Sequence, residues 1–163
     1  MDDGFHDYVT HRYERLRHTA YLLTGDRATA EDLVQTALAK AWVAWLRIEG
    51  DPDPYVYRIV VNTHASWWRR KWRDEVPAER LPDRADPRDF TAEVGGRQVL
   101  RQAIGTLSRR QRAVIVLHYF EELTLMQCAD VLGCSLATVK TQLGRALKHL
   151  RIHSEIQMIG AER

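Results

Sequence analysis

Residues 125–144 read Leu-Met-Gln-Cys-Ala-Asp-Val-Leu-Gly-Cys-Ser-Leu-Ala-Thr-Val-Lys-Thr-Gln-Leu-Gly, and three positions in this stretch have the spacing of a helix-turn-helix. Ala129 is small enough for two helices to approach closely, and Gly133 can adopt the left-handed conformation that the turn requires. Val139 can fill the crevice between the two helices, and Ser135 is placed to cap the second one. The stretch therefore predicts a helix-turn-helix.

The second helix of this motif, predicted over residues 136–150, has two distinct faces. Its apolar stripe consists of Leu136, Val139, Leu143, Leu147 and Leu150. The other side carries the small, polar and basic residues Lys140, Thr141, Gly144, Arg145 and Lys148. A short basic face on the second helix is what reading of the DNA major groove requires, so we expect these side chains to contact duplex DNA. A solvated face on a pair of core helices is the competing interpretation, because helical periodicity alone is common.

Charge alternates in blocks along the 163 residues, although the net charge of the whole chain is only +2. Residues 97–151 carry nine basic and three acidic side chains, and residues 67–73 carry four basic side chains and no acidic one. Between these blocks, residues 74–96 carry three basic and seven acidic side chains. Two basic blocks separated by an acidic one indicate two contacts with nucleic acid rather than one diffuse basic surface.

Helical spacing of apolar residues also recurs outside the motif, whereas strand signals are almost absent. Helices are predicted over residues 5–23, 27–46, 55–73 and 99–107, with a further one after Ser108. Asp26, Asp53 and Ser108 are placed to cap three of these helices. Three prolines and many charges between residues 74 and 96 argue against a packed core there. We therefore expect an all-α protein of two small helical domains, residues 1–73 and 97–155, joined by a flexible acidic linker at 74–96.

The end of the helix predicted over residues 55–73 interleaves aromatic and cationic side chains. It reads Trp67-Trp68-Arg69-Arg70-Lys71-Trp72-Arg73. Aromatic rings can stack on unpaired bases while arginines hold phosphates, which together grip single-stranded DNA. In the competing interpretation Trp67 lies in the core, Trp68 and Trp72 lie at its margin, and the helix dipole favours the basic end. The segment taken alone leaves both interpretations open.

The remaining composition excludes several functional classes. No apolar run is long enough to cross a bilayer, and the acidic N-terminus lacks the features of a secretory signal, so we expect a cytoplasmic protein. Cys128 and Cys134 are too few for a disulfide framework and wrongly spaced for a zinc site. The seven histidines are scattered, with no metal-binding His/Glu spacing, nucleophile elbow or phosphate-binding glycine loop. We therefore expect no enzyme activity, no metal and no cofactor.

Together these segments resemble the extracytoplasmic-function (ECF, group 4) sigma factors of bacterial RNA polymerase, most closely the SigE-like branch common in actinobacteria. The upstream signatures are Tyr21-Leu22-Leu23-Thr24-Gly25-Asp26, Ala30-Glu31-Asp32-Leu33-Val34-Gln35 and Tyr57-Arg58-Ile59-Val60-Val61-Asn62-Thr63. The downstream ones are Leu107-Ser108-Arg109-Arg110-Gln111-Arg112 and the helix-turn-helix ending in Thr138-Val139-Lys140-Thr141. The resemblance covers nearly the whole chain and implies sigma region 2 in residues 1–73 and sigma region 4 in residues 97–155.

The resemblance implies that the chain binds the polymerase core, recognises promoter DNA and helps to open it. The residues that match the core-binding motif are Glu31, Asp32, Gln35 and Thr36. The implied partners are the β′ clamp and the β flap of the polymerase core, promoter DNA and, as a candidate, an anti-sigma factor.

The resemblance also implies which residues contact the promoter. Residues matching the part that melts and reads the minus-ten element are Asn62, Trp68, Arg69, Arg70 and Trp72, together with the loop from Arg47 to Tyr55. Lys140, Thr141, Gly144, Arg145 and Lys148 are expected to read the minus-thirty-five element, although many relatives carry a larger side chain in place of Gly144. A LuxR-like helix-turn-helix regulator that does not bind polymerase core is the alternative function, and the upstream motifs argue against it.

Overall fold

A computed structural model describes residues 3–74 and 96–161 of the chain, and all regular structure in that part is helical. The N-terminal half contains α1 (Asp3–Thr24), α2 (Arg27–Ala44), the 3-10 turn η1 (Trp45–Arg47) and α3 (Asp53–Asp74). The C-terminal half contains α5 (Gly96–Gly105), α6 (Arg109–Ile115), the π-helical turn η2 (Val116–Phe120), α7 (Leu125–Leu132) and α8 (Leu136–Ala161). The predicted all-α class is confirmed, while the predicted linker lies outside the described residues except at its two ends.

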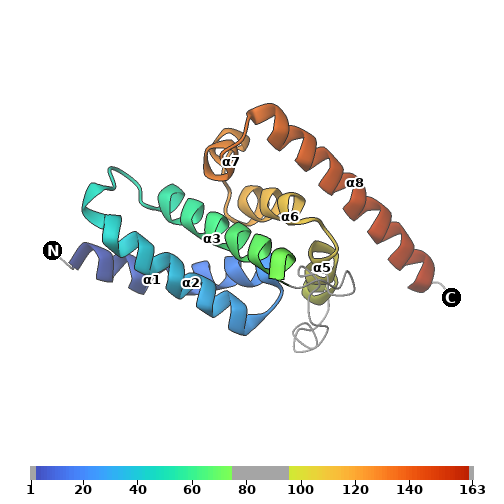
Figure 1. The fold of residues 1–163 in the computed structure, drawn as a ribbon. Coiled ribbons are helices and arrows are strands. Elements are labelled where there is room, and N and C mark those ends of the chain that lie inside the picture. Colours follow the sequence, from blue (N-terminus) through green and yellow to red (C-terminus); the bar gives the residue numbers. More distant parts are fainter. Residues whose placement is uncertain (1–2, 75–95, 162–163) are drawn as a thin grey trace.

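The two halves of the chain pack against each other. Helix α3 lies between α2 on one side and α7 on the other, and α7 in turn packs against α8 (Figure 1). Helix α1 lies along α2 and also contacts α5, α6 and η2. The buried apolar side chains form one cluster that runs through both halves. The sequence did not predict this shared core, because patterning within each helix does not say which distant helix covers it.

Side-chain caps fix the helix boundaries largely as the sequence predicts. Asp26 accepts a hydrogen bond from the Thr29 backbone N–H at 2.9 Å at the start of α2. Ser108 forms a reciprocal capping box with Gln111 at the start of α6. The cap predicted at Asp53 is wrong, because α3 already begins at that residue and its backbone N–H donates to the Asp51 carboxylate at 3.0 Å.

The helix-turn-helix is present in α7 and α8. Gly133 ends α7 with a φ of 68°, the left-handed conformation expected there, and Val139 is fully buried between the two helices. Ala129 is buried, and Ser135 Oγ accepts from the Thr138 backbone N–H at 3.1 Å. These four predictions are confirmed. Each depends on local geometry that the residue type itself favours.

Helix α8 differs from its prediction in length and in one position of its apolar stripe. It runs to Ala161, whereas the pattern predicted an end at residue 150. Leu147, expected in the stripe, is 38% exposed. Ala146 is buried in its place, and Leu143 and Leu150 pack against the core from either side of it. The buried stripe therefore passes through residues 143, 146 and 150, still at a spacing of three and four residues. The large apolar side chain at position 147 obscured this path in the sequence.

We predict opposite effects on stability for alanine at two glycines of this motif. A Cβ atom would meet nothing within 4 Å at either Gly133 or Gly144, so only the backbone conformation differs between them. Gly133→Ala should lower the free energy of unfolding by about 1–2 kcal/mol, because an L residue is strained at positive φ. Gly144→Ala, in the interior of a helix, should raise it by up to about 1 kcal/mol. Urea unfolding measures both, and equal effects would contradict the turn geometry.

Candidate functional site

One side of α2 presents the four polar residues predicted to bind a protein partner. Glu31, Asp32 and Gln35 are exposed, and Thr36 is half-buried. The opposite side is packed into the core through Ala30, Leu33, Val34, Ala37, Leu38 and Ala41. Because that buried side fixes the helix, the polar side chains are held on a rigid support and remain accessible.

The same side of α2 continues beyond the polar residues as an apolar surface. Val43 and Leu46 follow Asp32 by about three and four helical turns, and they are 77% and 73% exposed. Trp42 at the edge of this surface is half covered by Phe5, whose ring centroid lies 5.0 Å away in an edge-on contact. Exposed apolar side chains that gather in one place mark interaction surfaces more often than isolated ones do. No role for Val43 and Leu46 was predicted from the sequence.

A cavity of about 380 Å³ lies between the end of α2 and the start of α3. It is lined by Ala44, Arg47, Ile48, Glu49, Asp51, Pro54, Tyr55 and Arg58. Asn62 is exposed one turn after Arg58 on the same face of α3, and the exposed Arg69 follows two turns later. The loop from Arg47 to Tyr55, which the resemblance assigns to the minus-ten part, therefore lines a cavity with polar and aromatic walls, and Asn62 lies one turn beyond that cavity along α3.

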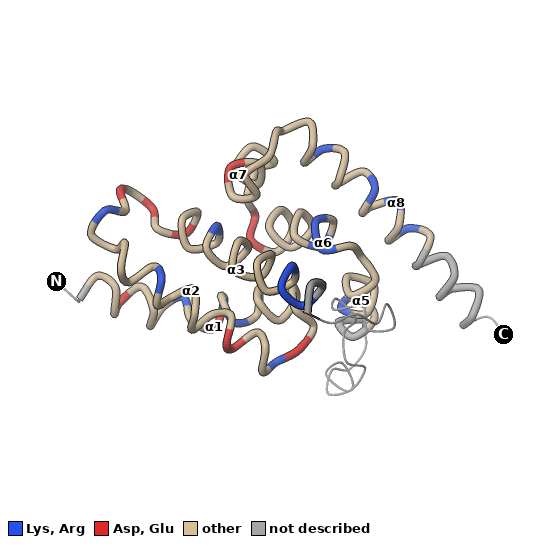
Figure 2. The backbone as a smooth tube through the Cα atoms, viewed as in Figure 1, with Lys and Arg blue, Asp and Glu red and all other residues tan. Residues whose placement is uncertain are grey.

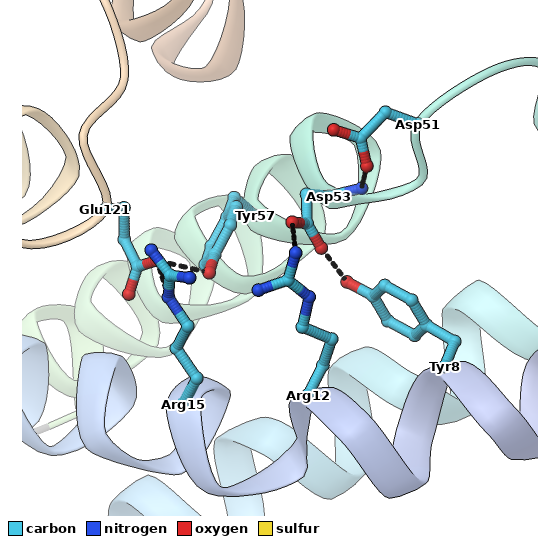
Figure 3. Close-up of polar contacts among 7 residues, drawn as sticks. All are labelled: Tyr8, Arg12, Arg15, Asp51, Asp53, Tyr57 and Glu121. Atoms are coloured by element: carbon cyan, nitrogen blue, oxygen red, sulfur yellow. Dashed lines mark hydrogen bonds and ion pairs between the residues drawn. The ribbon is translucent and has the colours of Figure 1, made fainter.

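The start of α3 is anchored to α1 by a second set of polar contacts (Figure 3). The Asp53 carboxylate accepts a hydrogen bond from the Tyr8 hydroxyl at 2.8 Å and pairs with the Arg12 guanidinium at 2.8 Å. Burial, and then the bond to Asp53, raise the pKa of Tyr8, so its hydroxyl stays a donor. These contacts hold one side of the loop that lines the cavity.

The Trp/Arg segment at the end of α3 does not present a single surface. Trp67 is half-buried against the core, as the competing interpretation expected, and the side chain of Trp72 lies outside the described part. Arg69 and Arg70 are exposed. Trp68 is half-buried on the side of α3 away from Asn62, with its ring centroid 6.3 Å from that of His64. The structure thus groups Arg69 with Asn62 and separates Trp68 from both.

The predicted DNA-reading face of α8 is accessible along its whole length. Lys140, Thr141, Gly144, Arg145 and Lys148 are all exposed. The Thr141 hydroxyl donates to the Ala137 carbonyl at 3.0 Å. Lysine and arginine positions follow one another along the backbone of this helix (Figure 2). The five residues therefore form one continuous, basic surface.

A buried carboxylate connects the two halves of the chain. Glu121, directly after η2, is 7% exposed. Its oxygens accept hydrogen bonds from Arg15 Nε at 2.8 Å and from the Tyr57 hydroxyl at 2.5 Å (Figure 3). They also accept a hydrogen bond from the Thr19 hydroxyl, and all three donors belong to the N-terminal half. The Glu121 charge raises the pKa of Arg15, and burial together with the bond to Glu121 raises the pKa of Tyr57. These contacts of Glu121 were not predicted from the sequence, where their only signal is an acidic residue at the end of an apolar run.

Arg112 makes a second polar connection between the halves. Its side chain is 1% exposed and donates to the Leu23 carbonyl at 2.7 Å, at the end of α1. It also donates to the carbonyls of Gly105 and Leu107, at 3.0 and 3.1 Å, at the end of α5. A guanidinium suits this position because it carries several donors in one plane and stays charged when buried. Arg112 therefore binds the C-terminal ends of two helices from different halves.

Within the described parts of the chain, no three metal-binding side chains cluster, and no helix is long and apolar enough to span a membrane. Cys128 is fully buried, and burial raises the pKa of its thiol to about 11. A thiol in that state is a poor nucleophile.

Two family models match the chain, one on each half. The model described as Sigma-70 region 2 matches residues 8–74, and the model described as Sigma-70, region 4 matches residues 97–150. The first match contains the α2 and α3 surfaces, and the second contains the helix-turn-helix. The acidic stretch lies between them.

Among curated proteins, the chain is similar to RNA polymerase sigma-E factors of Streptomyces. It is 38% identical to that of Streptomyces coelicolor over 90% of this chain and 84% of the relative, and 37% identical to that of Streptomyces avermitilis over 96% and 88%. Among solved structures, the fold is similar to the sigma factor RpoE in complex with the anti-sigma factor NepR from Bartonella quintana. That likeness has a TM-score of 0.76 and 23% identity, and it covers 96% of this chain and 99% of that one.

We predict that His64 makes the fold sensitive to mild acid. Burial, and then the charges of Arg112 and Arg109, lower the pKa of His64 to about 4 from an ordinary value of 6.5. The unfolded chain therefore takes up a proton at a higher pH than the folded chain, and stability falls as the pH drops from 6.5 towards 4. His64 should account for a loss of about 2 kcal/mol between pH 7 and pH 5.

The measurement is the free energy of unfolding across that range for the wild type and for His64→Asn. The variant should show a flatter pH dependence, whereas His11→Asn, at an exposed histidine, should keep the wild-type slope. Equal slopes for the wild type and His64→Asn would show that His64 is not held neutral in the fold.

Proposed function

The chain belongs to the ECF branch of the sigma-70 family of RNA polymerase sigma factors, and on this basis we propose which of its surfaces carry out initiation. A sigma factor binds RNA polymerase core and directs it to promoter DNA. The observation that carries the assignment is the exposure of a suitable surface in each half of the chain. The half matched by region 2 exposes the polar side of α2 and one face of α3, and the half matched by region 4 exposes the basic face of α8. We propose residues 1–73 as the region 2 domain, residues 74–96 as an acidic linker and residues 97–155 as the region 4 domain.

The polar side of α2 is the proposed core-binding surface. Glu31, Asp32, Gln35 and Thr36 project from a helix whose other side is locked in the core, so binding requires little reordering. The partner proposed for this surface is the β′ clamp, while the β flap is the further polymerase contact of the chain. As an initiation factor, the chain has no catalytic step of its own in this proposal, and it works with cytoplasmic polymerase. An anti-sigma factor is a further proposed partner, as for the structurally similar RpoE.

The face of α3 that carries Asn62 is the proposed minus-ten surface. An unpaired base needs a cavity to enter, a polar group to pair with its edge and cations for the phosphates on either side. The cavity beside Tyr55 and Arg58 can receive the base, and the Asn62 amide can pair with the edge of that base. Arg69 and Arg70 are the cations that can hold the phosphates. Trp68 and Trp72 complete the proposed set as stacking platforms.

The exposed face of α8 is the proposed minus-thirty-five surface. Lys140, Thr141, Gly144, Arg145 and Lys148 lie on the second helix of a helix-turn-helix, the element that enters the major groove. Gly144 has no side chain that could contact DNA, so it exposes backbone in the middle of this face and lets DNA approach closely. A LuxR-like regulator would use the same helix, but it would not need the polar side of α2.

We predict that Asp32→Arg combined with Gln35→Ala weakens binding to sigma-free bacterial core polymerase at least ten-fold. The change removes two side chains that can form hydrogen bonds with the partner and reverses one charge at the centre of the proposed surface. A ten-fold weaker affinity corresponds to a loss of roughly 1.4 kcal/mol of binding free energy. Binding can be followed by fluorescence anisotropy of labelled protein. Asp7→Arg, an equal charge change at an exposed position of α1, is the matched control and should bind like the wild type. Unchanged binding by the double variant would remove α2 as the core-binding surface.

We also predict that Asn62→Ala and Arg69→Ala each reduce promoter opening without reducing core binding. Both residues are exposed on α3, Asn62 one turn beyond Arg58 of the cavity and Arg69 two turns further along, so neither supports the core. Permanganate footprinting of unpaired thymines, on a promoter that wild-type holoenzyme opens, should show reactivity reduced about ten-fold, as expected for the loss of one base or phosphate contact. Wild-type footprints for both variants would place the melting surface elsewhere.

A further inference from the structure

We propose that a cavity between α1, α2 and α5 binds the phosphate groups of a small nucleotide, and that an adjoining cavity holds its base. None of the residues that line the two cavities belongs to the surfaces proposed above for polymerase core or for promoter DNA. The nucleotide site is therefore an additional one, and it does not depend on the proposed function.

The first cavity lies among three helices and is lined mainly by polar side chains. Its volume is about 250 Å³, which is the space of roughly eight water molecules and is enough for linked phosphate groups. Helices α1, α2 and α5 each contribute one arginine to its wall. The full lining consists of Glu14, Arg17, His18, Tyr21, Arg27, Ala30 and Arg101.

Positive charge exceeds negative charge in this lining. It contains three arginines and one acidic residue, Glu14, whose carboxylate pairs with the Arg17 guanidinium at 2.6 Å. Asp26 and Glu31 are close by but do not line the cavity. Asp26 caps α2 through the Thr29 backbone N–H. Three arginines against one lining carboxylate leave an excess of two positive charges, which favours an anion with more than one charge.

The ring of Tyr21 holds two of the three guanidinium groups. The Cζ atoms of Arg27 and Arg101 lie 5.7 and 4.9 Å from its centroid. Tyr21 itself is buried in the core and is therefore fixed. Contact with the face of a ring positions a guanidinium without occupying its N–H groups, which lie in the guanidinium plane. Both cations are thus held in place before an anion arrives, which lowers the ordering cost of binding.

A second cavity, of about 290 Å³, adjoins the first, since His18 and Arg101 line both. Its other lining residues are the apolar Leu22, Leu100 and Phe120. Leu100 is 45% exposed although it is a large apolar residue, and the Phe120 ring lies edge-on to that of His18, with centroids 6.5 Å apart. The flat faces of a nucleobase bury well against aromatic and aliphatic side chains. The two cavities together therefore offer cations for phosphates and an apolar wall for a base.

The arrangement of the cations favours a small nucleotide over a nucleic acid strand. Phosphates of duplex DNA are spread along the double helix, so they are met by extended basic faces such as that of α8. Here the guanidinium groups come from three helices and line one cavity. Cations gathered in this way suit phosphates that are joined to one another, as in a nucleoside diphosphate.

The test measures binding of ADP and GDP to the full chain by isothermal titration calorimetry at low salt. Arg27→Gln and Arg101→Gln each remove one guanidinium from the first cavity, and Leu100→Ala shortens the apolar wall of the second. Arg110→Gln is the matched control, because it removes the same charge from an exposed arginine that lines neither cavity. Pyrophosphate and adenosine, titrated separately, distinguish the phosphate part of the site from the base part. Affinity for duplex DNA is measured on the same variants, and far-UV circular dichroism checks helicity.

Both nucleotides should bind the wild type with dissociation constants below about 0.1 mM. Each of the two cavity arginine variants should bind ADP about ten-fold more weakly or worse, because a charge-assisted hydrogen bond is lost. Leu100→Ala should weaken binding of ADP but not of pyrophosphate, and adenosine alone should bind more weakly than ADP. Arg110→Gln should bind ADP like the wild type.

Absence of saturable nucleotide binding up to about 1 mM, or equal ADP affinity in the wild type and both cavity arginine variants, would overturn the site. Loss of duplex DNA affinity in those variants, without nucleotide binding, would make the cavity a contact for DNA phosphates and also overturn it. Unchanged ADP affinity in Leu100→Ala would overturn the place of the base. If Arg101→Gln loses helicity, Arg27→Gln decides the matter. No polymerase is involved, so each of these outcomes leaves the proposed function standing.

Discussion

The Glu121 carboxylate, buried among Arg15, Thr19 and Tyr57, determines how the two halves of this chain lie against each other. Apolar contacts between helices tolerate sliding and rotation, because they are not directional, whereas three hydrogen bonds to one carboxylate tolerate little. Arg112 adds a second directional constraint through the carbonyl at the end of α1. Buried polar groups of this kind contribute more to selecting one arrangement than to the free energy of unfolding. Which surfaces of the N-terminal half face solvent, and which face the C-terminal half, follows from these contacts.

The surfaces that we propose for initiation differ in how exposed they are. The polar side of α2 and the basic face of α8 are both accessible while the two halves are packed together. The side of α3 that carries Trp68 faces the C-terminal half, next to cations of α6. The apolar continuation of α2 through Val43 and Leu46 lies beside the proposed core-binding residues and is uncovered in the free chain.

What the sequence predicted well depends on neighbours along the chain. Caps at Asp26 and Ser108, the left-handed Gly133 and the buried Val139 all follow from a residue type in its local setting. Asp53 was mistaken for a cap because its real partners, Tyr8 and Arg12, lie more than 40 residues away in the chain. Glu121 and Arg112 were missed for the same reason, since a charged residue in an apolar run reveals its role only when its distant partner is known. Whether the side of α3 that carries Trp68 is exposed likewise depends on which helix packs against it.

The most direct measurement of the central claim, that this chain is a sigma factor, is transcription by sigma-free bacterial core polymerase on a library of randomised promoters. With the protein added, transcripts should start at discrete sites, and the templates that yield them should share sequence at two elements about 25 base pairs apart, one for each DNA-contacting half. Without the protein, these starts should be absent. If the protein binds duplex DNA but never supports initiation by the core, it is a helix-turn-helix regulator and the assignment is contradicted.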